Sequence, residues 1–208
     1  MRFAGSLNQI FGKKSKVKIL RLLSLYKKEA TIREISREIN ITPPNVSRIL
    51  KELEKEGVIT SKKVGRSILH SLNSRHYLVK HIILPAFKKE KEAKENLAKF
   101  LKRKLNSEIE SIILFGSIAK QKEKPDSDID LLFIVSDESN PKTLEEKIST
   151  LNPKITEYFG NSISPLIMKV SEFKLRLKKN DKLLKSILKE GEVLQGKSIS
   201  EILCQKDF

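Results

Sequence analysis

Cysteine, tryptophan and long apolar runs are scarce or missing in this sequence of 208 residues. Its single cysteine, Cys204, excludes an intrachain disulfide and any metal site built on several cysteines, and it suits a reducing compartment. No stretch approaches the roughly 18–20 apolar residues of a membrane-spanning helix, and the N-terminal residues lack the apolar core of a signal peptide. We therefore expect a soluble, cytoplasmic protein without a membrane partner.

Acidic residues are also scarce, but only in the first part of the chain. Residues 1–89 hold 20 Lys and Arg against 6 Asp and Glu, a formal charge of +14. Residues 90–208 hold 22 against 20, a charge of +2, and the whole chain carries +16. This uneven distribution indicates two domains, 1–89 and 90–208, with different partners. The basic domain favours a polyanion, most simply nucleic acid.

Three short amphipathic helices are predicted in the basic domain. Apolar residues three or four positions apart predict helices over residues 16–25, 32–39 and 43–56. Thr31 and Glu34 have the spacing of a capping box at the start of the second helix. Thr42 suits the cap of the third helix, with Pro43 at its first position. Gly57 suits the left-handed position that follows this helix.

A two-stranded wing is predicted after the third helix. The β-prone segments 58–63 and 67–72 flank a turn at 64–66, as in a hairpin. The order in the basic domain is therefore helix, helix, turn, helix, wing. A further helical region runs over residues 77–105, with a break or kink expected at Pro85.

The third helix has a basic face opposite its apolar face, and a helix at this position of a helix-turn-helix enters the major groove. Asn45 and Arg48 are candidates for base contacts, because Asn to adenine and Arg to guanine are geometrically favoured pairs. Candidates for phosphate contacts are Ser47 and Lys51 on the helix and Lys62, Lys63 and Arg66 on the wing. Thr42 completes the predicted DNA-binding set. The alternative is a solvated basic surface on a domain that binds a protein.

Residues 10–72 closely resemble the winged helix-turn-helix regulators of bacteria and archaea, of the MarR and ArsR type. The resemblance implies that the second helix of the motif reads double-stranded DNA while the wing grips the backbone. It also implies a homodimer on two half-sites, with the helix from Tyr77 onward as a dimer seam.

A second set of candidate residues lies between two apolar runs, 111–115 and 131–135, which are predicted strands. Gly116 and Ser117 follow the first strand; Gly116 allows close backbone approach to a phosphate, and Ser117 offers an amide and a hydroxyl. Asp128 and Asp130 are spaced i, i+2 and so point to one face. Two neighbouring carboxylates are costly without a positive partner, and Mg²⁺ prefers carboxylate and phosphate oxygens. The pattern predicts a metal and phosphate site.

This ordered set resembles the minimal nucleotidyltransferases of the polymerase-β superfamily, over roughly residues 90–195. The matching residues are Gly116, Ser117, Ser127, Asp128, Ile129, Asp130 and Leu131. The resemblance implies a nucleoside triphosphate at Gly116 and Ser117, with Mg²⁺ on catalytic Asp128 and Asp130. It also implies transfer of a nucleoside monophosphate to an acceptor.

Two positions depart from that family's pattern. Lys120 stands where arginine is common, which keeps a charge but loses the bidentate fork. Active members have a third carboxylate on a later strand, whereas residues 161–168 contain no acid. Ser164 lies near the expected position, followed by Pro165, which disturbs strand pairing unless the strand is at an edge. The missing acid argues against fast transfer more than against binding.

We expect an α+β fold of two domains, a winged helix-turn-helix followed by a small nucleotidyltransferase-like domain with a mixed sheet flanked by helices. Beyond Asp130, the sequence predicts a helix over 143–151, a strand over 162–170 and one basic helix over 172–189.

The predicted function is that of a DNA-binding transcriptional regulator whose second domain binds nucleoside triphosphate with Mg²⁺, or a protein partner. The first alternative is an active nucleotidyltransferase that modifies a protein, a small molecule or a nucleic-acid end. The second is an antitoxin-like component of a toxin–antitoxin pair, because minimal nucleotidyltransferases are often paired with small helical toxins.

Overall fold

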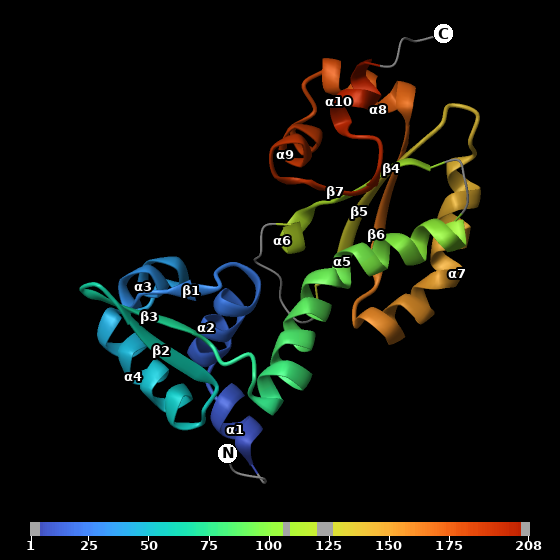
Figure 1. The fold of residues 1–208 in the computed structure, drawn as a ribbon. Coiled ribbons are helices and arrows are strands. Elements are labelled where there is room, and N and C mark those ends of the chain that lie inside the picture. Colours follow the sequence, from blue (N-terminus) through green and yellow to red (C-terminus); the bar gives the residue numbers. More distant parts are fainter. Residues whose placement is uncertain (1–4, 106–108, 120–126, 205–208) are drawn as a thin grey trace. The chain divides into compact units, whose positions relative to one another are not determined.

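A computed structural model gives the structure of residues 5–105, 109–119 and 127–204 (Figure 1). Contacts divide the chain into a first unit, Met1–Glu92, and a second unit, Ala93–Phe208. Both units contain helices and strands, which confirms the α+β class expected from the sequence. Within the described ranges, no helix has both the length and the apolar character needed to span a bilayer.

The first unit has the predicted order of a winged helix-turn-helix. Its helices are α1 (Ser6–Phe11), α2 (Lys14–Leu25), α3 (Ile32–Ile39) and α4 (Pro43–Lys55). Its strands are β1 (Glu29–Ala30), β2 (Ile59–Val64) and β3 (Ser67–Leu72), with β3 between the other two and antiparallel to both. The three predicted helices and the wing are confirmed. Helix α1 and strand β1 were not predicted, because both are too short to show a clear apolar period.

The ends of α3 and α4 show which predicted caps form. The Thr31 hydroxyl accepts a hydrogen bond from the Glu34 N–H at 3.3 Å, and the Thr31 N–H donates to the Glu34 carboxylate at 2.8 Å, so the capping box is confirmed. The predicted Thr42 side-chain cap is wrong: its hydroxyl makes no cap hydrogen bond to α4. The two prolines that begin α4 have no N–H to offer, which removes two of the donors that a cap would satisfy.

Beyond the wing, the helical region contains a π-helical turn. This turn, η1 (Val79–Ile83), leads directly into α5 (Leu84–Leu105). Pro85 lies in the first turn of α5, so its missing N–H leaves the carbonyl four residues earlier without its usual partner. The irregularity predicted at Pro85 therefore falls just before it, as a locally wider turn.

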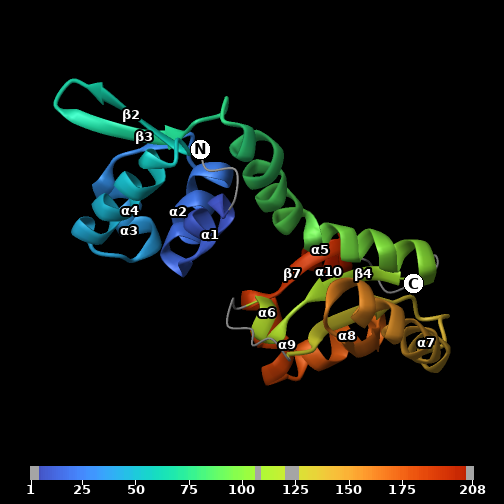
Figure 2. The same ribbon diagram turned by 90° about the horizontal axis from the view of Figure 1, so that it is seen from below.

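The second unit is built on a mixed four-stranded sheet in the order β6-β5-β4-β7, whose strands are labelled in Figure 1 and which Figure 2 shows from below. The strands are β4 (Ile109–Leu114), β5 (Ile129–Val135), β6 (Ile163–Lys169) and β7 (Glu192–Gly196). Strands β5 and β6 are parallel, and the other two pairs are antiparallel. The predicted mixed sheet is thus confirmed, and β6 lies at its edge.

Helices cover both faces of this sheet. They are α5, α6 (Gly116–Ala119), α7 (Pro141–Phe159), α8 (Val170–Lys178), α9 (Lys182–Glu190) and α10 (Ile199–Cys204). Leu131 and Phe133 of β5 pack with residues of α5 and α7 on one face. Leu132 and Ile134 pack with residues of α8, α9 and α10 on the other. The alternation along β5 places Asp130 on the face of α8 to α10.

Two helix predictions for the second unit are corrected by the structure. The helix predicted over 143–151 is the longer α7, which continues through an internal proline, Pro153. The single helix predicted over 172–189 is wrong, because α8 and α9 are separate. Asn180 between them has a φ of 62°, in the left-handed region that interrupts a helix.

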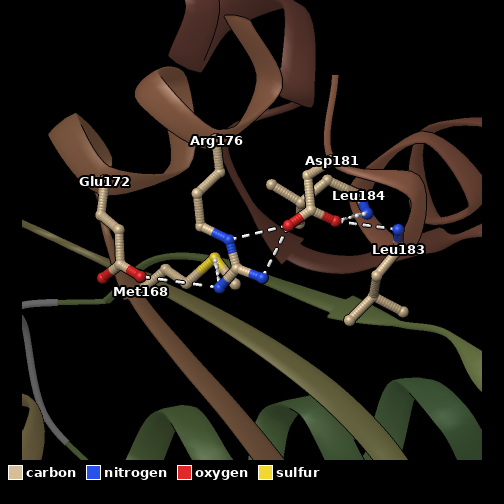
Figure 3. A network of polar contacts seen from close by, with 6 residues as sticks. All are labelled: Met168, Glu172, Arg176, Asp181, Leu183 and Leu184. Carbon is tan, nitrogen blue, oxygen red and sulfur yellow. Dashed lines mark hydrogen bonds and ion pairs between the residues drawn. The ribbon is translucent and has the colours of Figure 1, made fainter. Parts of the chain in front are cut away.

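A network of polar contacts fixes the turn between α8 and α9 (Figure 3). Arg176 donates to one carboxylate oxygen of Asp181 through Nε at 2.9 Å and Nη2 at 2.7 Å. The other oxygen of Asp181 accepts from the N–H groups of Leu183 and Leu184, at 2.8 and 3.1 Å, and so caps α9. The guanidinium and these N–H groups lower the pKa of Asp181. Arg176 therefore links the two helices through the cap of the second.

Asn152 of α7 closes the outer edge of β6. Its amide donates to the Ile163 carbonyl at 3.0 Å, and its oxygen accepts from the Ile163 N–H at 2.8 Å. Among the strands that the structure describes, β6 pairs only with β5, so no described strand offers these two backbone groups a partner on the outer side. Asn152 thus takes the place of a further strand where β6 begins.

We expect Asn152→Ala to destabilise the second unit by about 2 kcal/mol, because it leaves a buried N–H and a carbonyl unsatisfied. Urea unfolding of the full chain measures the change. Thr150→Ala on the exposed side of α7 serves as the control and should change stability by less than about 0.5 kcal/mol. Equal effects of the two substitutions would contradict this role for Asn152.

Candidate functional site

The predicted Gly-Ser turn lies directly against the second aspartate of the predicted pair. Gly116 follows the end of β4 with a φ of +74°, and the preceding Phe115 N–H donates to the Asp130 carbonyl at 3.0 Å. A Cβ on residue 116 would overlap the Asp130 carboxylate. Gly116 is therefore required both by its backbone angle and by the close approach of this carboxylate.

Asp130 occupies an electrostatically unfavourable position. Burial raises the pKa of its carboxyl group, the charge of Asp128 raises it further, and the Ser117 N–H, which donates to Asp130, opposes the shift. Among the described residues, none with a positive charge forms an ion pair with Asp128 or Asp130. Gly116, Ser117 and Asp128 each lie close enough to interact with Asp130, so the structure brings together the four residues predicted for this site.

Two serines, one just before β6 and one on it, lie beside the two aspartates. The Ser162 hydroxyl donates to Asp128, and Ser164 lies in parallel register with Asp130. Pro165 follows on an edge strand, where its missing N–H is tolerated. Ser162 was missed in the sequence, although its spacing from Ser164 repeats the i, i+2 spacing of the two aspartates. Lys120 lies outside the described residues.

The donor set fits a hard divalent cation that also has ligands from a phosphate. Two adjacent carboxylates lose their mutual repulsion when such a cation binds between them. A complete protein cage is not present: within the described ranges, no group of three or more His, Cys, Asp and Glu could hold a metal ion. The two aspartates alone would leave the remaining positions to phosphate oxygens and water.

We expect Gly116→Ala to destabilise the second unit by about 3 kcal/mol, from the left-handed backbone angle and from the clash with Asp130. Gly160→Ala is the matched control, because Gly160 also has a positive φ, +90°, but a Cβ there would meet nothing within 4 Å. The control should lose only about 1–2 kcal/mol. Thermal and urea unfolding measure both, and equal losses would show that the contact with Asp130 is unimportant.

The predicted DNA-binding residues on α4 lie on its outer side. Asn45, Arg48 and Lys51 are exposed, as is Thr42 just before the helix, while Ser47 is half-buried. Arg48 Nη2 donates to Asn45 Oδ1 at 3.3 Å, so the two candidates for base contacts are neighbours. An open groove of about 540 Å³ runs along this side of the helix. It is lined by Pro44, Ser47, Arg48, Lys51, Glu52 and Lys55.

The wing presents the other predicted basic residues. Lys62, Lys63 and Arg66 are exposed on the hairpin of β2 and β3, around a turn in which Gly65 has a φ of +57°. Ile68, on β3, is also half exposed, at 52%. The exposed tip of the hairpin, with charged and apolar side chains, is a suitable surface for a partner, whereas Ile59 and Leu72 at the base of the hairpin pack with the core of the first unit.

Family models match both units. The polymerase beta nucleotidyltransferase model matches residues 95–200, and a winged helix-turn-helix DNA-binding model matches residues 13–60. The chain is similar to the HTH-type transcriptional repressor SmtB of Mycobacterium tuberculosis, with 33% identity over 70 residues, 34% of this chain and 50% of that protein. It therefore spans about half the length of the curated relatives it matches.

Solved structures also resemble parts of the chain. HlyU from Vibrio cholerae N16961 has 20% identity and a TM-score of 0.36, over 41% of this chain and 88% of that one. A toxin–antitoxin structure with AMP-PNP has 18% identity and a TM-score of 0.37, over 52% of this chain and 77% of that one.

Proposed function

The chain belongs to the polymerase beta nucleotidyltransferase family, and because a winged helix-turn-helix precedes that domain, we propose a DNA-binding transcriptional regulator that binds nucleoside triphosphate with Mg²⁺. One observation supports binding over transfer. Asp128 and Asp130 lie beside the Gly-Ser turn, but the residue in register with Asp130 on the neighbouring strand is Ser164, not an acid. In this proposal, nucleotide binding to the second unit is the signal that regulates the first unit, and the second unit does not transfer a nucleoside monophosphate efficiently.

The proposed nucleotide site uses four residues. Asp128 and Asp130 hold Mg²⁺, and Gly116 and Ser117 lie against the triphosphate. When bound, Mg²⁺ neutralises phosphate charge and stabilises the charge that develops on a transferred group. Support comes from the close approach of Gly116 to the Asp130 carboxylate, from the Ser117 N–H that donates to Asp130, and from the nearby charge of Asp128.

The proposed DNA interface is the outer side of α4 together with the wing. Asn45 and Arg48 read base edges, while the other predicted residues contact the backbone. Those residues are Thr42, Ser47, Lys51, Lys62, Lys63 and Arg66. Support comes from the exposed, basic surface of α4 and from the charge of +14 over residues 1–89.

Calorimetry with a non-hydrolysable ATP analogue tests the nucleotide site. The full chain should bind the analogue with Mg²⁺ and lose this binding in EDTA. Incubation with α-labelled ATP, Mg²⁺ and cell extract should then leave no label on protein or nucleic acid. Transfer that vanishes in Asp130→Ala would instead establish the active nucleotidyltransferase.

Selection of duplexes from a random-sequence pool tests the DNA interface. The wild-type chain should enrich a defined sequence, and Arg48→Ala should relax the preference at one position. A chain that enriches no sequence is not a sequence-specific regulator, and the basic surface would then serve another partner.

A further inference from the structure

Lys16 is a buried charge in the first unit that the proposed DNA interface does not use. Its side chain is only 6% exposed, on a helix whose neighbouring residues form the apolar core. Its ammonium donates to the Gln9 carbonyl of α1 at 2.7 Å and lies 2.7 Å from a carboxylate oxygen of Glu52 on α4. Lysine is rarely buried without such partners, so these contacts fix the ammonium beneath α4.

Glu52 lies among the residues of the proposed DNA-binding surface. It lines the groove along α4 with Arg48, Lys51 and Lys55, and it is the one acidic residue among those that line it. Its side chain is 35% exposed. A bare carboxylate there would repel a DNA phosphate and reduce the positive potential of the neighbouring side chains.

We propose that Lys16 is a positioning residue for DNA binding: it holds Glu52 from below and neutralises it, so that the groove along α4 presents positive charge. This inference rests on the proposed DNA-binding function. The buried ammonium does not itself reach a phosphate. Its hydrogen bond to Glu52 is the largest influence that lowers the pKa of that carboxyl group, ahead of the charges of Lys13 and Arg48.

The experiment measures binding of a duplex of roughly 30 base pairs and mixed sequence, long enough for two half-sites one helical turn apart. The full-length variants are Lys16→Met, Glu52→Gln, their combination, and Lys51→Met as the control for a direct phosphate contact. Fluorescence anisotropy over a series of salt concentrations gives the affinity and its salt slope. Circular dichroism and thermal unfolding of each variant establish that it is folded.

Lys16→Met should weaken binding about fivefold near 0.1 M salt, without changing the salt slope, because no phosphate contact is lost. Adding Glu52→Gln should restore wild-type affinity, because the unpaired carboxylate is gone. Lys51→Met should instead reduce the slope by about one counterion.

Two outcomes would overturn the inference. A reduced slope in Lys16→Met would make Lys16 a direct phosphate contact, and weak binding that persists in the folded double variant would show that Glu52 is not the group Lys16 controls. Failure of the wild-type chain to bind the duplex at any salt concentration is a different result, since it would overturn the proposed DNA-binding function as well.

Discussion

Replacing Ser164 with aspartate is expected to tighten Mn²⁺ binding at Asp128 and Asp130 by about 100-fold. Ser164 lies in register with Asp130 on the parallel neighbour strand, so the new carboxylate would face the same side of the sheet. A third negative ligand adds attraction for a divalent cation and replaces a neutral hydroxyl. Titration with Mn²⁺, followed by electron paramagnetic resonance of the free ion, measures the affinity directly.

Stability of this variant provides a second readout. In EDTA, three neighbouring carboxylates repel one another, so Ser164→Asp should unfold at a lower temperature than the wild type. Mn²⁺ should reverse this difference, because it binds only the folded site. Ser164→Asn, of similar size but neutral, should show neither effect. An aspartate variant that behaves like the asparagine variant would show that residue 164 does not face the metal site.

The sequence predicted the fold best where local rules and tertiary structure agree. The capping box at Thr31 and the left-handed glycine after α4, Gly57, each depend only on residues within one turn of helix. The local sequence is therefore enough to predict both. The break at Asn180 was missed because the apolar residues on its two sides, such as Leu177 and Leu184, keep a helical spacing of seven across the polar residues 178–182. The turn depends on Asp181 and its ion pair with Arg176, which spacing alone does not reveal.

The candidate site was predictable for a related reason. Gly116, Ser117, Asp128 and Asp130 belong to a motif of fixed order, and the strands on either side of it are apolar enough to be recognised. The partner strand was less informative, because its register with β5 is decided by the whole sheet. Only the structure shows that Ser162 contacts Asp128 while Ser164 lies beside Asp130.

Charge pairs between helices were beyond the reach of sequence patterns. Lys16 and Glu52 are far apart in the chain, and each resembles an ordinary surface residue when its own helix is considered alone. Their contact depends on how α2 and α4 pack together around the core of the first unit. Lys16 stands in the basic stretch 13–18, which gives no signal of such a pair, because long side chains there usually extend to solvent.

Asp130→Asn is expected to weaken Mg²⁺-dependent nucleotide binding by at least about 100-fold, because it removes one of the two proposed carboxylate ligands. The same change should stabilise the metal-free protein. Burial and the charge of Asp128 raise the pKa of Asp130, so the folded state disfavours its charged form.

The sign of the pH dependence follows from this raised pKa. Between about pH 4 and that raised value, the folded wild type binds more protons than the unfolded chain, so its stability falls as pH rises. Asparagine cannot ionise, so the stability advantage of Asp130→Asn in EDTA should grow over this range and then level off.

Glu138→Gln, which neutralises an exposed carboxylate just beyond β5, is the control and should change neither binding nor stability. Nucleotide binding that survives Asp130→Asn would place the ligand elsewhere in the protein, whereas lost binding with unchanged stability would mean that the two aspartates do not repel each other in the folded state.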